Sequence, residues 1–182
     1  MDLIHPKNGP RTEYHKNGQK LTEENYKDGK LNGKWTWWYE NGQKSIEGNY
    51  KDGKRDGKYT SWYKGGKKKS EGNFEDGKFN GRWTDWYENG QIEIEGNYKN
   101  DKKDGKQAAW YDNGKIMEER NFKDGNAQGK FTKWYDNGQK MEERNFKDNY
   151  PEGKSTKWYA NGQIEIEGNC INNRPIGKLN LF

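Results

Sequence analysis

A period of 24 residues runs through the chain and constrains its fold more than any other feature. A glycine recurs at this step in a first series, which comprises Gly18, Gly42, Gly66, Gly90, Gly114, Gly138 and Gly162. In a second series each glycine precedes Lys or Arg, and its members are Gly33, Gly57, Gly81, Gly105, Gly129, Gly153 and Gly177. Seven units without an insertion between these landmarks predict a repeat protein, in which each unit packs mainly against its neighbours.

Each unit has the sequence pattern of two β-strands and two turns. The phrase WYENGQ begins at Trp38 and returns in similar form at Trp86, Trp110, Trp134 and Trp158. The segment KWTWWYE favours a strand, NG provides the positive φ of a tight hairpin, and QKSIEGNY returns as the partner strand. The link KDGKRDGK then turns the chain into the next hairpin. A two-residue NG loop and a three-residue loop with a glycine bulge both fit this pattern. The two loops shift the pairing of the strands by one residue relative to each other, which would place the side chains on opposite faces, so the hairpin register stays open.

This pattern predicts an all-β fold with little or no helix, because no apolar stretch of helical period is long enough to form one. We expect an elongated, β-solenoid-like array of seven antiparallel hairpins that form a largely single-layered, twisted sheet. The expected organisation is an N-terminal cap at residues 1–10, a repeat array at residues 11–170 and a C-terminal capping strand at residues 171–182. The aliphatic and aromatic residues available to these caps are Leu3, Ile4, Ile171, Ile176, Leu179, Leu181 and Phe182.

Composition decides whether such a chain folds at all. Hydrophobic residues make up only 27% and charged residues 35%, which is close to the composition of disordered chains. Aromatic residues, however, make up 15%, and each buries a large area when it packs. We therefore expect a folded protein whose aromatic columns supply an apolar layer. One such column is Tyr26, Tyr50, Phe74, Tyr98, Phe122 and Phe146, and it ends at Cys170.

Charge and cysteine content exclude several classes of protein. The net charge of +5 arises from 34 basic and 29 acidic residues mixed along the chain, so it only weakly indicates nucleic acid or an anionic membrane. The single cysteine excludes an intramolecular disulfide framework. The first residues, MDLIHPKNGP, lack the apolar region of a signal peptide, and no stretch is apolar enough to span a membrane. We expect a soluble, cytoplasmic protein.

Carboxylates that suggest acid–base chemistry also follow the period, at Glu23, Glu47, Glu71, Glu95, Glu119, Glu143 and Glu167. Seven equal copies favour a structural ladder, in which Glu or Asn bonds to a turn or to the Lys after each glycine, because an enzyme usually needs one asymmetric constellation. The string GKST near Gly153 lacks the first glycine and the helix of a phosphate-binding loop. His5 and His15 form no catalytic or metal-binding pattern. We expect no catalytic residue, no cofactor, no metal and no enzymatic activity.

Two columns depart from the repeat, and both point to one face of a strand because they are two residues apart. The first column is Trp35, Tyr59, Trp83, Gln107, Phe131 and Ser155, and the second is Trp37, Ser61, Asp85, Ala109, Lys133 and Lys157. Their aromatic members cluster in the first half of the chain, with Tyr39 and Tyr63 nearby. Such a patch has the composition of a protein-binding hot spot, although the same rings could instead thicken the packing layer.

A lysine-rich turn lies next to this patch in the sequence. KGGKKK replaces the usual ENGQK and places Lys64, Lys67, Lys68 and Lys69 at one hairpin tip. This tip could contact an acidic partner or a phosphate backbone, and the competing interpretation is a solvated turn.

The run GKWTWWYENGQKSIEGNYKDGKRDGK resembles the MORN repeat, in the bacterial variant in which WYxNG and EGNYKDGK alternate. The resemblance extends over residues 11–178 and implies an elongated, largely single-layered antiparallel sheet of hairpins. Similar bacterial proteins are often described as antitoxins of the YwqK type, whereas other MORN proteins resemble scaffolds or contact phospholipid. The resemblance implies no catalytic residues.

Three functional hypotheses follow. The first is a non-enzymatic binding protein of bacterial or phage type that acts as an inhibitor, meaning an antitoxin, immunity or anti-defence protein that sterically blocks a toxin or nuclease. The second is direct binding of RNA or single-stranded DNA through aromatic and lysine side chains. The third and lowest-ranked is attachment to anionic phospholipid, or a scaffold role. The oligomeric state stays open.

Overall fold

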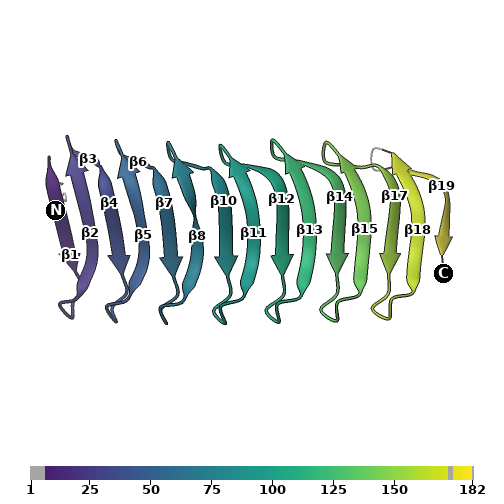
Figure 1. Cartoon of the computed structure of the whole chain (residues 1–182), viewed down its shortest axis with the longest axis horizontal. Helices are drawn as coiled ribbons and strands as arrows, with labels where there is room; N and C mark the ends of the chain where they lie inside the picture. The colour runs from purple at the N-terminus through teal and green to yellow at the C-terminus, as the bar shows by residue number, and fades with distance from the viewer. Residues whose placement is uncertain (1–6, 172–173, 182) are drawn as a thin grey trace. The chain divides into compact units, whose positions relative to one another are not determined.

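A computed structural model describes residues 7–171 and 174–181 (Figure 1). The chain divides into two compact units, residues 1–90 and residues 91–182. Antiparallel strands make up both units, and no helix occurs among the described residues. The predicted all-β array of hairpin repeats is confirmed. The proposed cap residues Leu3, Ile4 and Phe182 lie outside the described part of the chain.

Strands follow one another in chain order within each unit (Figure 1). Unit 1 contains β1 (Gly9–Tyr14), β2 (Lys20–Lys27), β3 (Lys30–Leu31), β4 (Gly33–Trp38), β5 (Lys44–Lys51), β6 (Lys54–Arg55), β7 (Gly57–Trp62), β8 (Lys68–Glu75), β9 (Lys78–Phe79) and β10 (Gly81–Trp86). Unit 2 contains β11 (Ile92–Lys99), β12 (Lys102–Trp110), β13 (Ile116–Lys123), β14 (Asn126–Trp134), β15 (Lys140–Lys147), β16 (Tyr150–Pro151), β17 (Gly153–Trp158), β18 (Ile164–Ile171) and β19 (Arg174–Leu181). The short strands β3, β6, β9 and β16 each share a partner strand with the strand that follows them.

The NG loop has three residues and a glycine bulge, which settles the register that the sequence leaves open. The amide N–H of Tyr39 donates to the carbonyl of Gln43 at 2.8 Å, and the N–H of Gly42 donates to the carbonyl of Tyr39 at 2.9 Å. Gly42 has a φ of 80°, a conformation that glycine adopts at little cost. After the bulge Trp38 pairs with Lys44, and both loop bonds recur at His15, Tyr63, Tyr111, Tyr135 and Tyr159.

The Asp-Gly turns at the opposite ends of the strands are two-residue hairpins. Asp52 and Gly53 have φ values of 51° and 84°, and Lys51 pairs directly with Lys54. Two successive positive φ angles define a type I′ turn, whose twist matches that of the flanking strands. The N–H of Gly53 also donates to the carbonyl of Leu31 in the preceding repeat at 2.8 Å, and the equivalent bond recurs at Gly29, Gly77, Gly125 and Asn149.

Tyrosine hydroxyls tie four of the NG loops to the next repeat within the same unit. Tyr39, Tyr63, Tyr111 and Tyr135 each donate to the backbone carbonyl of the tryptophan 23 residues further on, at 2.6–2.8 Å. Asn41 adds a second link, because its side chain donates to the carbonyl of Lys64 at 2.9 Å. The recurring WYENGQ phrase therefore encodes the loop and the bond to the neighbouring loop.

Alternation along the strands gives each unit two different faces. One face carries Lys34, Thr36 and Trp38 on β4 opposite Lys44 and Glu47 on β5, with their counterparts in other repeats; we call it the ladder face. The other carries Trp35 and Trp37 on β4 and Tyr50 on β5, with their counterparts, and we call it the ring face. The two variable columns of the sequence both lie on the ring face.

Candidate functional site

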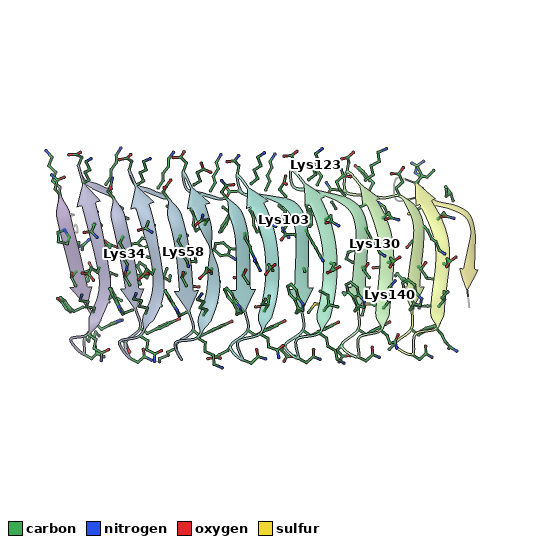
Figure 2. All side chains as sticks on the ribbon, in the orientation of Figure 1. Lys34, Lys58, Lys103, Lys123, Lys130 and Lys140 are labelled. Atoms are coloured by element: carbon green, nitrogen blue, oxygen red, sulfur yellow. The ribbon has the colours of Figure 1, made fainter. Side chains whose placement is uncertain are left out.

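The ladder face repeats one ionic arrangement. The Nζ atom of Lys34 lies 3.0 Å from Glu47 Oε2, and Lys44 bonds to the same carboxylate oxygen. Partial burial raises the pKa of Glu47, but the hydrogen bonds and charges of the two lysines outweigh this effect, so that its pKa is lowered. Figure 2 shows Lys34 and Lys58 in unit 1 and Lys130 and Lys140 in unit 2. Glutamates with two such lysine partners are Glu47, Glu71 and Glu143.

Tryptophan and threonine complete each rung of the ladder face. The Lys44 Nζ lies 5.9 Å from the ring centroid of Trp62 in the next repeat, within the range of a cation–π contact. The threonines between the charged columns are buried, at Thr36, Thr60, Thr84, Thr132 and Thr156. The predicted link to the lysine after each glycine is present for five glutamates of the column, namely Glu47, Glu71, Glu119, Glu143 and Glu167. These carboxylates are therefore part of the framework. Carboxylates held ionised by lysines are poor proton donors near neutral pH.

The ring face of unit 1 is an aromatic cluster around one arginine. The guanidinium carbon of Arg55 lies 5.7 Å from the ring centroid of Trp35, 5.6 Å from that of Tyr59 and 5.3 Å from that of Phe74. Tyr59 in turn stacks on Trp83 at 5.5 Å. Phe74 also meets Phe79 and Trp83, at 4.6 Å and 6.0 Å between ring centroids, so each ring of the cluster packs against others.

The sequence-predicted anchors have unequal exposure within this cluster. Trp35 is buried, with 5% of its surface exposed, and Tyr59 and Trp83 are half-buried. Trp37 is 42% exposed and meets Trp35 edge to face, with ring centroids 5.7 Å apart. The packing interpretation therefore applies to Trp35, whose ring is buried, whereas Trp37 presents its ring to solvent and remains available for binding.

Other predicted contact residues lie at the loop edge of unit 1. Tyr39 and Tyr63 use their hydroxyls to bond to the next repeat. In the lysine tip, Lys68 bonds to Glu71 at 2.7 Å and Lys69 lies 5.7 Å from the Tyr63 ring. All four tip lysines, Lys64, Lys67, Lys68 and Lys69, are exposed. The tip is thus separate from the aromatic cluster, and its charge is available to solvent.

On the ring face of unit 2 the two variable columns hold a single aromatic ring, that of Phe131, and their other positions carry polar, charged or small side chains. The central cation of this face is Arg120, whose guanidinium carbon lies 4.6 Å from the centroid of the buried Phe131. Next to Arg120, Gln107 and Ala109 occupy the two variable columns and border a hollow of about 140 Å³. The sequence signal for this hollow was the interruption of both columns by a glutamine and an alanine, but no local pattern indicated that the arginine and the hollow would adjoin.

Two further observations concern only the part of the chain that the structure describes. No group of three or more His, Cys, Asp or Glu side chains is arranged to hold a metal ion there. Nor does that part contain a helix with the length and apolarity needed to span a membrane.

Fold and site together define a β-hairpin repeat protein with a uniform framework and a variable face. Seven segments match the family model described as a MORN repeat variant, at residues 7–28, 31–52, 55–76, 79–100, 103–124, 127–148 and 151–172. These segments cover most of the chain, which belongs to the MORN repeat family. A search of curated proteins found no match. MORN repeats are generally modules that bind proteins or membranes, whereas the likeness to YwqK-type antitoxins stays a prediction.

Proposed function

We propose that this protein binds another protein through the ring face of unit 1, without catalysing a reaction, and acts as an inhibitor of the antitoxin, immunity or anti-defence type. The observation that carries the proposal is Trp37, a large aromatic side chain that is 42% exposed above a packed cluster. Tryptophan is among the residues most enriched in binding hot spots. The inhibitor role rests on the family resemblance, and its mechanism is steric coverage of the partner.

Preorganisation supports this choice of surface. Trp37 leans on Trp35, which is held by Tyr50 at 5.6 Å and by Arg55. A ring that is already fixed loses little conformational entropy when a partner covers it. The exposed lysine tip would attract an acidic partner and increase the association rate, with little effect on the final affinity.

The absence of catalysis is part of the proposal and is supported by the ladder face. The pKa of Glu71 is lowered by its hydrogen bond to Lys68, against the opposing effect of partial burial, with Lys58 also contributing. Glu143 has the same two kinds of lysine partner and a lowered pKa as well, although burial opposes it. Equal, ionised and charge-paired carboxylates support the framework and lack the asymmetry of an active site.

The experiment is affinity capture from a lysate of the source cell, with wild type, Trp37→Ala and Trp62→Phe as baits. Trp62 lies on the ladder face and serves as the aromatic control. We expect one protein to be captured by wild type and by Trp62→Phe and to be lost with Trp37→Ala. Purified wild type should then inhibit the activity of that protein, and Trp37→Ala should do so weakly. Equal capture by all three baits would contradict the proposed surface.

Capture of nucleic acid would support the second hypothesis instead. In that case nuclease treatment should release the bound material, and its affinity should fall steeply as salt concentration rises. This result, if unaffected by Trp37→Ala, would replace the protein-inhibitor proposal.

A further inference from the structure

We propose that Arg55 binds a carboxylate of the partner protein, from an Asp or Glu side chain that has apolar neighbours. This inference rests on the proposed protein-binding function and adds the chemistry that the partner must present. Arg55 lies on β6, the short strand at the Asp-Gly turn edge of unit 1 (Figure 1). Its guanidinium carbon lies 5.3–5.7 Å from the ring centroids of Trp35, Tyr59 and Phe74.

Arg55 departs from the repeat at its own position. One period before and one period after it the chain has Leu31 and Phe79, which are both apolar. Phe79 packs against Phe74 and Trp83, with 4.6 Å between ring centroids in each case. An apolar side chain therefore satisfies the packing at this position, and the charge of Arg55 is not needed for it.

Arg55 also differs from the other arginines of the ring face, because it has no carboxylate partner. The other three are each paired with a glutamate two residues away, in the pairs Arg11 and Glu13, Arg120 and Glu118, and Arg144 and Glu142. No carboxylate oxygen of the described residues lies within 4.0 Å of the Arg55 side chain. The anion that neutralises this cation in a complex must come from another molecule.

The carboxylates on the ring-face strands of unit 1 already have other partners. Glu13 is paired with Arg11, and Glu24 accepts a hydrogen bond from the Tyr26 hydroxyl at 2.8 Å. Asp85 accepts one from Trp83 Nε1 at 3.0 Å. Each of these carboxylates would have to give up its partner before it could neutralise Arg55.

The guanidinium of Arg55 is accessible to a ligand. The side chain is half-buried, and it has no fully buried nitrogen that lacks a hydrogen bond, whereas Arg120 and Arg144 each have one at Nε. A guanidinium fits a carboxylate with two parallel hydrogen bonds. The surrounding rings exclude part of the water, so an ion pair formed there is screened less than one on an open surface.

The position of Arg55 also suits a partner segment that covers the exposed Trp37. Both side chains contact the buried Trp35, with 5.7 Å between the ring centroids of the two tryptophans and 5.7 Å from the Arg55 guanidinium to the Trp35 centroid. Apolar side chains next to the carboxylate would therefore cover rings of unit 1. This combination of an aromatic anchor and an arginine is typical of binding hot spots.

A protein carboxylate fits this site better than the phosphates of a nucleic acid. Nucleic acid is bound by a series of cations that follow its backbone, whereas Arg55 is a single cation among rings. Lys34 and Lys58 in the same unit belong to the ladder face, where each is paired with a glutamate. We therefore expect one acidic side chain with apolar neighbours.

The test begins with a random peptide library displayed on phage and selected on the whole wild-type chain. We expect the selected peptides to share an Asp or Glu next to large apolar residues. The strongest peptide is then synthesised with a fluorescein label, together with a version in which the shared acid is replaced by Asn or Gln. By fluorescence anisotropy the wild type should bind the acidic peptide at least about tenfold more tightly, because the amide cannot form the ion pair.

Two variants assign the preference to Arg55. Arg55→Leu introduces the residue found at Leu31, so it should keep the circular dichroism spectrum of the wild type and bind both peptides alike. Arg120→Leu is the matched control, since Arg120 also lies against three rings but is paired with Glu118. Its preference for the acidic peptide should equal that of the wild type.

The inference is overturned if no peptide is selected, if the selected peptides share no acid, or if the wild type binds acid and amide alike. This last comparison needs no variant, so it holds whether or not Arg55→Leu folds. The inference is also overturned if folded Arg55→Leu keeps the preference or if Arg120→Leu loses it. Binding of labelled oligothymidylate that depends on Arg55, without binding of acidic peptides, would assign the site to phosphate instead.

Failure of this inference can be distinguished from failure of the proposed function. Peptide binding that is lost with Trp37→Ala but is indifferent to the acid would contradict the role of Arg55 and leave the proposed surface intact. Conversely, acid-specific binding through Arg55 with no Trp37-dependent capture from the lysate would contradict the role of Trp37 alone.

Discussion

The ring faces of the two units differ far more than their ladder faces do. In unit 1, Tyr26, Trp35 and Phe74 are buried and three rings surround Arg55. In unit 2 the column to which Trp35 belongs holds Gln107, Phe131 and Ser155, and a hollow lies beside Gln107. The lysine–glutamate pairs and tyrosine bonds are nevertheless shared by both units. The loops and the ladder face therefore hold the repeats together in both units, whereas the ring face varies from repeat to repeat.

The largest expected difference between the two units is in the free energy of unfolding when the residue in the first variable column is replaced by alanine. Trp35→Ala should lower the free energy of unfolding by about 3–5 kcal/mol, because it removes a buried ring from the cluster. Gln107→Ala should change it by less than about 1 kcal/mol, since it removes one bond but also an unsatisfied acceptor. Urea unfolding of both variants measures the difference. Equal losses would show that the ring faces contribute alike.

Two glycines provide a second matched pair. A Cβ at Gly72 would lie 2.1 Å from Trp83 Cε3, and one at Gly96 would lie 1.7 Å from Gln107 Oε1. Gly72→Ala should cost about 1–3 kcal/mol, because the Trp83 ring is packed and cannot yield. Gly96→Ala should cost less, since the glutamine amide can rotate into the hollow. Thermal unfolding tests the order, and a larger loss for Gly96→Ala would contradict it.

The tyrosine bonds should be equivalent in the two units. Tyr39→Phe and Tyr135→Phe each remove one hydrogen bond to a tryptophan carbonyl, at 2.7 Å and 2.8 Å respectively. Each should lower the free energy of unfolding by about 1 kcal/mol. Amide hydrogen exchange near Trp62 and Trp158 would locate the loss. A loss confined to one unit would break the claim of a shared framework.

The smallest expected effect concerns the pH dependence of the ladder. The folded-state pKa of Glu71 is lowered chiefly by the hydrogen bond from Lys68, so its contribution to stability is full above the ordinary glutamate pKa and is lost as pH falls through the lowered value. Glu71→Gln should therefore reduce stability by about 0.5 kcal/mol at neutral pH, and the difference from wild type should vanish in acid. Urea unfolding across this pH range, with Glu143→Gln as the counterpart in unit 2, measures it. A difference that grows in acid would contradict the assignment.

The repeat, the strand content and the pairing of glutamates with lysines were predictable from the sequence, because these features depend on local spacing and periodicity. The type of NG loop was not predictable, since a two-residue and a three-residue loop accept the same glycine. They differ in which residues of the two strands pair, and this is not visible in the sequence. The bonds from Tyr39 and Tyr63 were missed for another reason, as their partners are 23 residues away and are backbone carbonyls. Those two tyrosines were assigned to partner contact, and the structure gives their hydroxyls a role between repeats.

The aromatic patch was predictable as a cluster but not in its division of roles. Trp35 and Trp37 lie on one face, as their spacing requires, yet only the structure distinguishes the buried ring from the exposed one. Gln107 and Ala109 were visible as interruptions, whereas their proximity to Arg120 depends on the pairing of β12 with β13. Burial and cross-strand neighbours are therefore the information that the repeat pattern lacked.

We propose that recurring positions build the framework and that positions departing from the repeat bind the partner. The most direct test is the dissociation constant of the captured partner protein for wild type, Trp37→Ala and Trp62→Phe. The account predicts an increase of at least about tenfold for Trp37→Ala and no change for Trp62→Phe, because a hot-spot tryptophan dominates an interface while the ladder face remains outside it. An unchanged constant for Trp37→Ala, or a loss only with Trp62→Phe, would contradict it.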